Sequence, residues 1–208
     1  MSGPRVVLAI DTATAAGTVA LRVADRTRER RLEWRASFRQ IAPAVEGLMN
    51  EAGVDWRGLE AIAVPSGPGS FTGLRVGAAL ALGIARIAGR PLLGVPTLVA
   101  VAEAFARPDE RLVCATLDAR RGRRYAALCE RSASGLWDVL AGPLDATPAE
   151  VAGLAGEIRV VSPELALTHE PAGLAAALAR LAAADPDRYR SAGDGIELVY
   201  ARAGIDPV

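Results

Sequence analysis

The chain has 208 residues, of which 51% are hydrophobic, and its formal net charge is zero. That length allows one large domain or two small lobes with a buried core. Neutrality excludes a general electrostatic affinity for nucleic acid or anionic membranes. All 24 cationic residues are arginine, which excludes every site that needs a lysine, including the Walker A loop, the Schiff base and the kinase-type strand lysine.

Histidine and cysteine are scarce, which limits the possible metal sites. The single histidine, His169, lies in a proline-bounded segment and is expected to be a solvated loop residue. One histidine without a cysteine cluster predicts no metal site. Cys114 and Cys129 lie in alternating apolar runs and are predicted to be reduced core thiols.

Two features bear on location. No apolar run reaches the roughly 20 residues of a membrane span. The N-terminal residues lead directly into a strand, without the apolar core of a signal peptide. We therefore expect a cytoplasmic protein without membrane contact.

The chain opens with three predicted antiparallel strands, over residues 5–10, 18–24 and 28–35. The bend after the first strand carries Asp11 and Thr12. Such a bend can hold a phosphate through its N–H groups, with the carboxylate near a metal. Asp and Thr also form turns without any ligand, and the residues alone slightly favour the plain turn.

A glycine-rich loop then connects a buried strand, residues 59–64, to a helix over residues 74–88. Strand, tight turn and helix start direct several backbone N–H groups at one spot, which suits a phosphate, a carboxylate or a partner's polar loop. Ser70 or Thr72 is expected to cap the helix. The candidate nucleotide or anion site comprises Asp11, Thr12, Gly67, Gly69, Ser70 and Thr72.

Two helices of this first half carry notable faces. Glycine or alanine recurs every fourth residue from Gly73 to Gly89 in the second helix, so one face is almost bare. Because each helical glycine costs about 1 kcal/mol relative to alanine, Gly77 and Gly83 suggest close approach of another helix or a sheet. The preceding helix, residues 40–52, is amphipathic, with a stripe of Ile41, Val45, Leu48 and Met49.

A strand over 91–95 and a helix from Pro96 to about Ala106 complete this half, and a polar, proline-bearing segment at 107–110 is the best boundary. Two lobes are therefore expected, 1–106 and 107–208. In the second we expect strands over 112–117, 123–129, 136–140 and 158–161, helices over 147–154 and 173–184, and a last extended piece over 197–201. Both lobes begin with antiparallel strands and continue into helices, which indicates a coarse duplication. Arginines 120, 121, 123 and 124 form a solvated hairpin tip, or less often an RNA contact.

Several of these stretches together resemble one family. Leu8–Thr14 followed by Thr18–Leu21 is similar to the N-terminal hairpin of the TsaB (YeaZ) family, which acts in threonylcarbamoyladenosine biosynthesis. Gly67–Gly77 resembles that family's glycine-rich motif almost letter for letter. Further similar stretches are Gly94–Leu98, Leu117–Arg120 with Gly122 and Tyr125, and Val199–Arg202.

The resemblance implies an α/β, actin/Hsp70/sugar-kinase-like (ASKHA) fold with two related lobes, built of mixed sheets flanked by helices. It also implies a scaffold and activator that pairs with TsaD and TsaE to transfer a threonylcarbamoyl group to an adenosine beside the tRNA anticodon. ATP and metal are expected at these partners, and no cofactor in this chain. The pairing surface is expected on the two helices of the first lobe, at Ile41, Val45, Leu48, Met49, Gly73, Gly77, Leu80, Ala81 and Ile84.

Two alternatives remain open. The chain is a stand-alone ATPase or phosphotransferase that uses Asp11 and the glycine-rich loop, or, less well supported, a glycoprotease-like hydrolase that uses Ser70. Two departures from the family pattern also matter. Ser37 stands where many members have a histidine, and the C-terminal part is short. Self-association without the partner is plausible on the same helical face.

Overall fold

The first half of the chain builds a five-stranded sheet. The structure, a computed structural model, describes residues 3–15, 17–32, 37–165, 173–190 and 195–200. Strands β1 (Val6–Asp11), β2 (Thr18–Val23) and β3 (Arg26–Arg31) form the antiparallel meander, and β4 (Ala61–Gly67) and β5 (Leu92–Pro96) add parallel strands in the order β3-β2-β1-β4-β5. All seven residues of β4 are buried, as expected of a central parallel strand.

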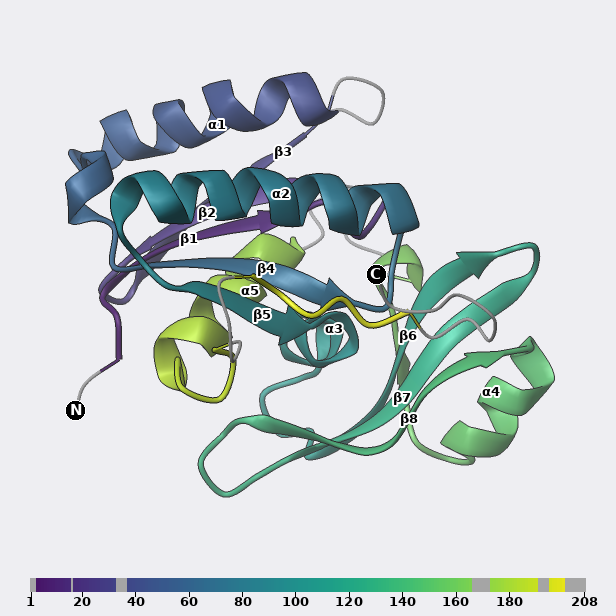
Figure 1. The fold of residues 1–208 in the computed structure, drawn as a ribbon. Helices are drawn as coiled ribbons and strands as arrows, with labels where there is room; N and C mark the ends of the chain where they lie inside the picture. Colours follow the sequence, from purple (N-terminus) through teal and green to yellow (C-terminus); the bar gives the residue numbers. More distant parts are fainter. Residues whose placement is uncertain (1–2, 16, 33–36, 166–172, 191–194, 201–208) are drawn as a thin grey trace.

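Two helices cover one face of this sheet (Figure 1). Helix α1 (Ser37–Ala52) lies over β2 and β3, and α2 (Phe71–Ala88) packs mainly on β4. Ser70 caps α2 through its hydroxyl, which accepts a hydrogen bond from the Gly73 amide at 3.2 Å. At the other end Gly89 takes a left-handed conformation, with φ of 64°, as a C-terminal glycine commonly does.

The second half builds a four-stranded sheet with matching topology. Strands β6 (Leu112–Arg120), β7 (Arg123–Arg131) and β8 (Trp137–Ala146) form an antiparallel meander, and β9 (Val160–Val161) is parallel to β6. The order β8-β7-β6-β9 repeats β3-β2-β1-β4 of the first sheet, so the predicted duplication is confirmed. Helix α4 (Pro148–Ala155) precedes β9 as α1 precedes β4, and it begins with a capping box formed by Thr147 and Glu150.

Two further helices join the sheets. Helix α3 (Thr97–Phe105) packs on β6, and α5 (Leu174–Ala184) contacts α3 and also crosses back to β1 and β2 of the first sheet. One hydrophobic cluster runs through both helices and both sheets, from Ala9 of β1 to Trp137 of β8. The expected boundary at 107 therefore separates two sheets that share a core.

Several element boundaries differ from the predicted ones. Strand β3 begins at Arg26 rather than residue 28 and ends at Arg31, and β8 extends to Ala146 instead of ending at residue 140. Helix α2 begins at Phe71, because Ser70 caps it. Two short 3-10 turns, Trp56–Gly58 and Pro163–Leu165, were not expected. With two mixed sheets flanked by helices, the predicted α/β class is confirmed.

Candidate functional site

The β1–β2 turn and the glycine-rich loop meet at the start of α2. The Thr12 hydroxyl donates a hydrogen bond to the Gly73 carbonyl oxygen at 2.7 Å, and the Ser70 amide donates to the Ala13 carbonyl oxygen at 2.9 Å. A Cβ on Gly73 would overlap the Thr12 carbonyl oxygen, and one on Gly77 would overlap the Thr12 hydroxyl. The two predicted anion-binding segments thus lie together, because glycines let α2 approach the turn.

Asp11 closes the turn with its own carboxylate. The side chain is fully buried, and its oxygens accept hydrogen bonds from the Ala13 amide at 2.8 Å and the Thr14 hydroxyl at 2.6 Å. Burial raises the pKa of Asp11 from 3.8 to about 6, although these hydrogen bonds oppose the shift. The turn therefore directs an amide at Asp11, and this geometry favours the plain-turn interpretation over phosphate binding.

A cavity of about 240 Å³ lies beside this junction, between the first sheet's loops and the β6–β7 hairpin. Gly69 and Ser70 of the predicted anion site line it, whereas Asp11, Thr12, Gly67 and Thr72 are not among its lining residues. Two carboxylates, Asp118 and Glu164, contribute negative charge to its wall, and Arg120 contributes a positive charge. The remaining lining residues are Ala13, Thr14, Ala15, Phe71, Leu117, Ala119, Tyr125 and Tyr200.

Tyr200 connects the C-terminal segment to this cavity. Its ring centroid lies 5.4 Å from that of Phe71, and its hydroxyl accepts a hydrogen bond from Arg75 Nε at 3.2 Å. The Arg75 guanidinium also stacks over the Phe71 ring at 3.9 Å. The described residues of the expected piece over 197–201 belong to no strand, and the Val199 amide donates to the Ser66 carbonyl oxygen at 2.7 Å. The segment thus lies along the end of β4.

The predicted partner-binding residues face the chain's own core, which corrects their expected orientation. Ile41, Val45, Leu48 and Met49 are at most 3% exposed and belong to the cluster between α1 and the first sheet. On α2, Gly73, Gly77 and Ala81 are buried too, while Leu80 and Ile84 are partly buried against the same cluster. The close approach that the small residues indicate is therefore that of this chain's own β1–β2 turn and first sheet.

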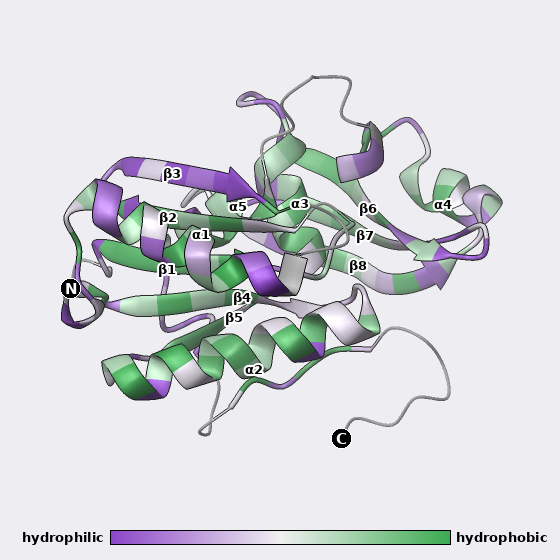
Figure 2. Ribbon diagram, turned by 90° about the horizontal axis from the view of Figure 1, so that it is seen from above, coloured by the Kyte–Doolittle hydropathy of each residue, from purple (hydrophilic) through white to green (hydrophobic). Residues whose placement is uncertain are grey.

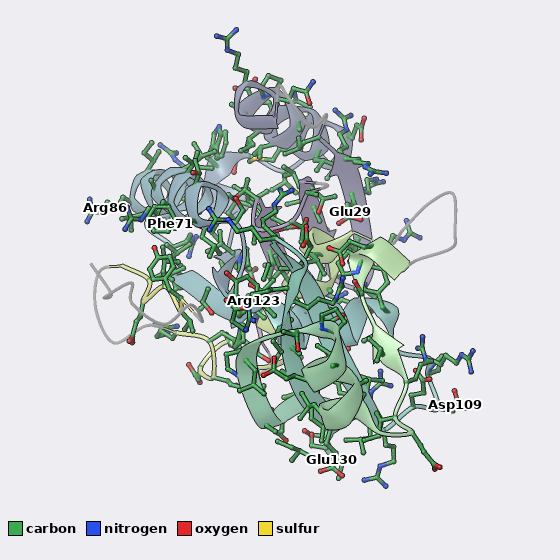
Figure 3. The ribbon with its side chains drawn as sticks, turned by 90° about the vertical axis from the view of Figure 1, so that its right-hand side faces the viewer. Glu29, Phe71, Arg86, Asp109, Arg123 and Glu130 are labelled. Carbon is green, nitrogen blue, oxygen red and sulfur yellow. The ribbon has the colours of Figure 1, made fainter. Side chains whose placement is uncertain are left out.

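A different face of α2 is exposed, and it carries apolar residues together with two arginines, Arg75 and Arg86. Phe71 is 42% exposed and Ile87 is 83% exposed, and Ala79 and Gly83 between them are also exposed. Figure 3 shows Phe71 and Arg86 on the outer side of this helix, and Figure 2 shows its apolar colouring from above. A line of residues four apart, Ala79–Gly83–Ile87, could have indicated this second face from the sequence.

Helix α2 is also the one helix in the described residues that is long and apolar enough to cross a membrane, which differs from the expectation that no span exists. Length and composition alone are weak evidence. Five of its residues are buried within this chain: Gly73, Leu74, Gly77, Ala81 and Ala85. The helix therefore serves here as a structural layer of the α/β fold.

The arginines of the β6–β7 hairpin are mostly paired with acids. Arg123 forms an ion pair with Asp145, and Arg124 Nη2 lies 2.8 Å from Glu164 Oε2. Arg120 lies 3.9 Å from Asp118, and Arg121 is exposed at the turn with φ of 55°. Neutralised side chains of this kind offer little net charge to an RNA phosphate.

The remaining predicted residues have simple outcomes. Cys114 and Cys129 are buried and unpaired, as predicted, and burial raises the pKa of the Cys129 thiol to about 12. His169 lies outside the described residues, as does the side chain of Ser37. Within the described part of the chain, no group of three or more His, Cys, Asp and Glu residues is placed to hold a metal ion.

Comparison with known proteins gives consistent relatives. The sequence model of the TsaD family, tRNA N6-adenosine threonylcarbamoyltransferase, matches residues 32–184. TsaB of Escherichia coli (strain K12), a tRNA threonylcarbamoyladenosine biosynthesis protein, is 39% identical over 134 residues, which is 63% of this chain and 58% of that protein. Its namesake from Haemophilus influenzae is 36% identical over 121 residues, 57% of this chain and 51% of that protein. These alignments span little more than half of the relatives' length.

A structural neighbour matches the fold over nearly its whole extent. YeaZ from Pseudomonas aeruginosa has a TM-score of 0.73 and 28% sequence identity, and the match covers 96% of this chain and 100% of that one. This agreement is consistent with the predicted actin/Hsp70/sugar-kinase type of fold.

Proposed function

The chain belongs to the TsaB (YeaZ) family, and from this premise we propose that it is a non-catalytic scaffold and activating subunit in tRNA threonylcarbamoyladenosine biosynthesis. It pairs with a TsaD-like paralogue that carries the active site, and with a TsaE-like ATPase. The complex transfers a threonylcarbamoyl group to the adenosine next to the tRNA anticodon. ATP and the metal ion bind at the partner subunits, and the complex works in the cytoplasm.

The observation that carries this proposal is the exposed apolar face of α2. An apolar side chain as exposed as Ile87, 83%, is stabilised when a partner covers it. Ala79 and Gly83 leave room for a partner helix to approach the backbone closely, and nothing lies within 4 Å of a Cβ built on Gly83. The α2 face, defined as Phe71, Ala79, Gly83 and Ile87, therefore suits a helix of the TsaD-like paralogue.

Asp11 and Ser70, the side chains that an enzyme would use here, already form hydrogen bonds within the chain. Asp11 is buried and accepts two hydrogen bonds within its own turn, and the Ser70 hydroxyl accepts the Gly73 amide as a helix cap. A metal ligand must be accessible to the ion, and Asp11 is fully buried. These contacts support a subunit that acts by binding rather than by catalysis.

Substitution on the α2 face tests the proposal. We expect Ile87→Glu and Gly83→Arg each to weaken binding to the TsaD-like partner by at least about tenfold, because a charge would be buried or a helix displaced. Leu140→Glu on β8, where the leucine is 54% exposed, is the matched control and should bind normally. Isothermal titration calorimetry measures the affinities, and a transfer assay on the mixed subunits reports activity.

Two outcomes contradict the proposal. One is full affinity in both α2 variants. The other is robust ATP hydrolysis by the chain alone that Asp11→Ala abolishes, which would favour the stand-alone enzyme. Sedimentation of the isolated chain gives a further test. The uncovered α2 face should allow the chain to self-associate, and Ile87→Glu should remove that self-association.

A further inference from the structure

Strand β3 is the most strongly basic element of an otherwise neutral chain. Its six residues, Arg26 to Arg31, contain four arginines and one glutamate, whereas the whole chain carries no net charge. The strand lies at the edge of the five-stranded sheet, and Figure 2 shows it hydrophilic along its length. One edge of the sheet is therefore cationic, although the chain as a whole carries no net charge.

Three of these arginines share one face. Arg26, Arg28 and Arg30 pair in register with Val23, Leu21 and Val19, so they lie on the α1 side of the sheet. Alternate residues of a strand are about 6.8 Å apart, which gives a regular row of guanidinium groups. Such a row suits the repeating phosphates of a nucleic acid backbone, because guanidinium binds phosphate oxygens in a bidentate manner.

The acids near the row leave most of its charge uncompensated. Glu29 points to the other face, where it accepts hydrogen bonds from the Gly173 and Ala176 amides at the start of α5, at 2.8 and 2.9 Å (Figure 3). Glu51 of α1 pairs with Arg30. Among the described residues, no acid pairs with Arg26 or Arg28, and both are exposed.

This arrangement contrasts with the β6–β7 hairpin, where Arg120, Arg123 and Arg124 each have an acidic partner. The row is also separate from the α2 face. Helix α1 packs on β2 and β3, while α2 packs on β4 and β5, so a protein bound on α2 leaves β3 uncovered (Figure 2).

We propose that the β3 row, Arg26, Arg28 and Arg30, contacts the phosphate backbone of the tRNA that the complex modifies. This inference rests on the proposed function for the identity of the RNA, and on the charge row for the contact itself. The contact is independent of sequence, because phosphates carry no base identity. It positions the tRNA on this chain while the base is modified in the neighbouring subunit.

A charge reversal on β3 tests the contact. The chain, alone and with its TsaD-like partner, is titrated with an unmodified tRNA transcript by fluorescence anisotropy, over about 50 to 300 mM salt. We expect the double variant Arg26→Glu/Arg28→Glu to bind at least about tenfold more weakly, and the slope of log affinity against log salt to fall by about two. The control, Arg111→Glu/Arg121→Glu, makes the same charge change at two other exposed arginines and should bind normally.

A charged edge strand has a second explanation, which is protection against strand pairing between chains. The same experiment distinguishes it from tRNA binding. Glutamates keep the edge charged, so protection alone predicts unchanged tRNA binding in the β3 variant. Equal loss in both double variants, no binding by the natural chain at low salt, or binding to phosphatidylserine vesicles but not to tRNA would each overturn the inference.

Partner binding by the same variants distinguishes the two proposals. If the chain binds its TsaD-like partner but the β3 variant keeps full tRNA affinity, only the present inference fails. If tRNA binding depends on β3 but no TsaD-like partner binds, the scaffold proposal fails while the RNA contact stands. Circular dichroism and urea midpoints are measured to check that both double variants fold.

Discussion

Asp11, a carboxylic acid buried at the end of β1, makes the stability of the chain depend on pH. Its pKa is raised by burial to about 6 in the folded chain, against an ordinary value of 3.8. Between these values the folded chain binds more protons than the unfolded chain. The free energy of unfolding therefore falls as pH rises through this window, by on the order of 3 kcal/mol for a shift of this size.

Asp11→Asn removes this ionisation and keeps an oxygen that can accept the Ala13 amide. We expect the variant to be more stable than the natural chain at about pH 7.5 and to lose most of that advantage at about pH 4.5, where Asp11 is protonated. Urea unfolding at several pH values measures the difference. Asp109→Asn, in an exposed loop (Figure 3), is the control.

The contributions of other titrating groups to the free energy of unfolding are the same in both chains, so they cancel in this comparison. The ion pair with Arg159 lowers the pKa of Glu110 to about 2, and this contribution is present in both chains. A stability difference that stays constant from pH 4.5 to 7.5 would contradict the raised pKa of Asp11.

Among the elements, α2 shows how much of the packing of a helix can be predicted from its sequence. The four-residue spacing correctly predicts that Gly73, Gly77 and Ala81 share a face that something approaches closely. The spacing cannot say whether that neighbour is the chain's own β1–β2 turn or another protein. Only the placement of Thr12 beside Gly73 and Gly77 decides it. The sequence also predicts a strand near β3, over residues 28–35, but the side of the sheet on which its alternate arginines lie follows only from the register with β2.

A matched pair of glycines on α2 tests which face is internal. Gly83→Ala should stabilise the chain by about 0.5–1 kcal/mol, because alanine is the better helix former and a Cβ there meets nothing within 4 Å. Gly77→Ala should destabilise it by about 1–3 kcal/mol, because its Cβ overlaps the Thr12 hydroxyl and disturbs the bond to Gly73. Urea unfolding gives both values. Stabilisation by both substitutions would show that the Gly77 face is not tightly packed.

For the whole molecule, the coarse duplication was predictable from the sequence, but the strand order and the shared core were not. Both halves show an antiparallel meander followed by a helix, and this pattern is visible in the residues. The destination of α5 is not, since an alanine-rich helix fits either sheet. The Glu29 carboxylate on β3 receives the first amides of α5, and Thr18 on β2 accepts the Ala175 amide at 3.1 Å. Polar contacts more than a hundred residues apart thus direct this helix to the first sheet.

A fragment of residues 1–106 is therefore expected not to fold as an independent lobe. Without α5 it exposes the face of the first sheet that contains Val7, Ala9 and Ala20, and those residues lose the helix that buries them. The α5 residues removed from that core are Leu174, Ala175, Ala177, Leu178, Ala179, Leu181 and Ala182.

Urea unfolding monitored by circular dichroism should show no cooperative transition for this fragment, in contrast to the full chain. Production together with a fragment of residues 107–208 should restore the transition, because it supplies α5 and the second sheet. If residues 1–106 unfold cooperatively alone, at a urea midpoint near that of the full chain, then α5 contributes little and the two lobes are independent folding units. If the transition is lost in residues 1–106 and the second fragment restores it, then the contacts of α5 make the chain one cooperative structure. The α2 face and the β3 row are held at fixed positions in that structure.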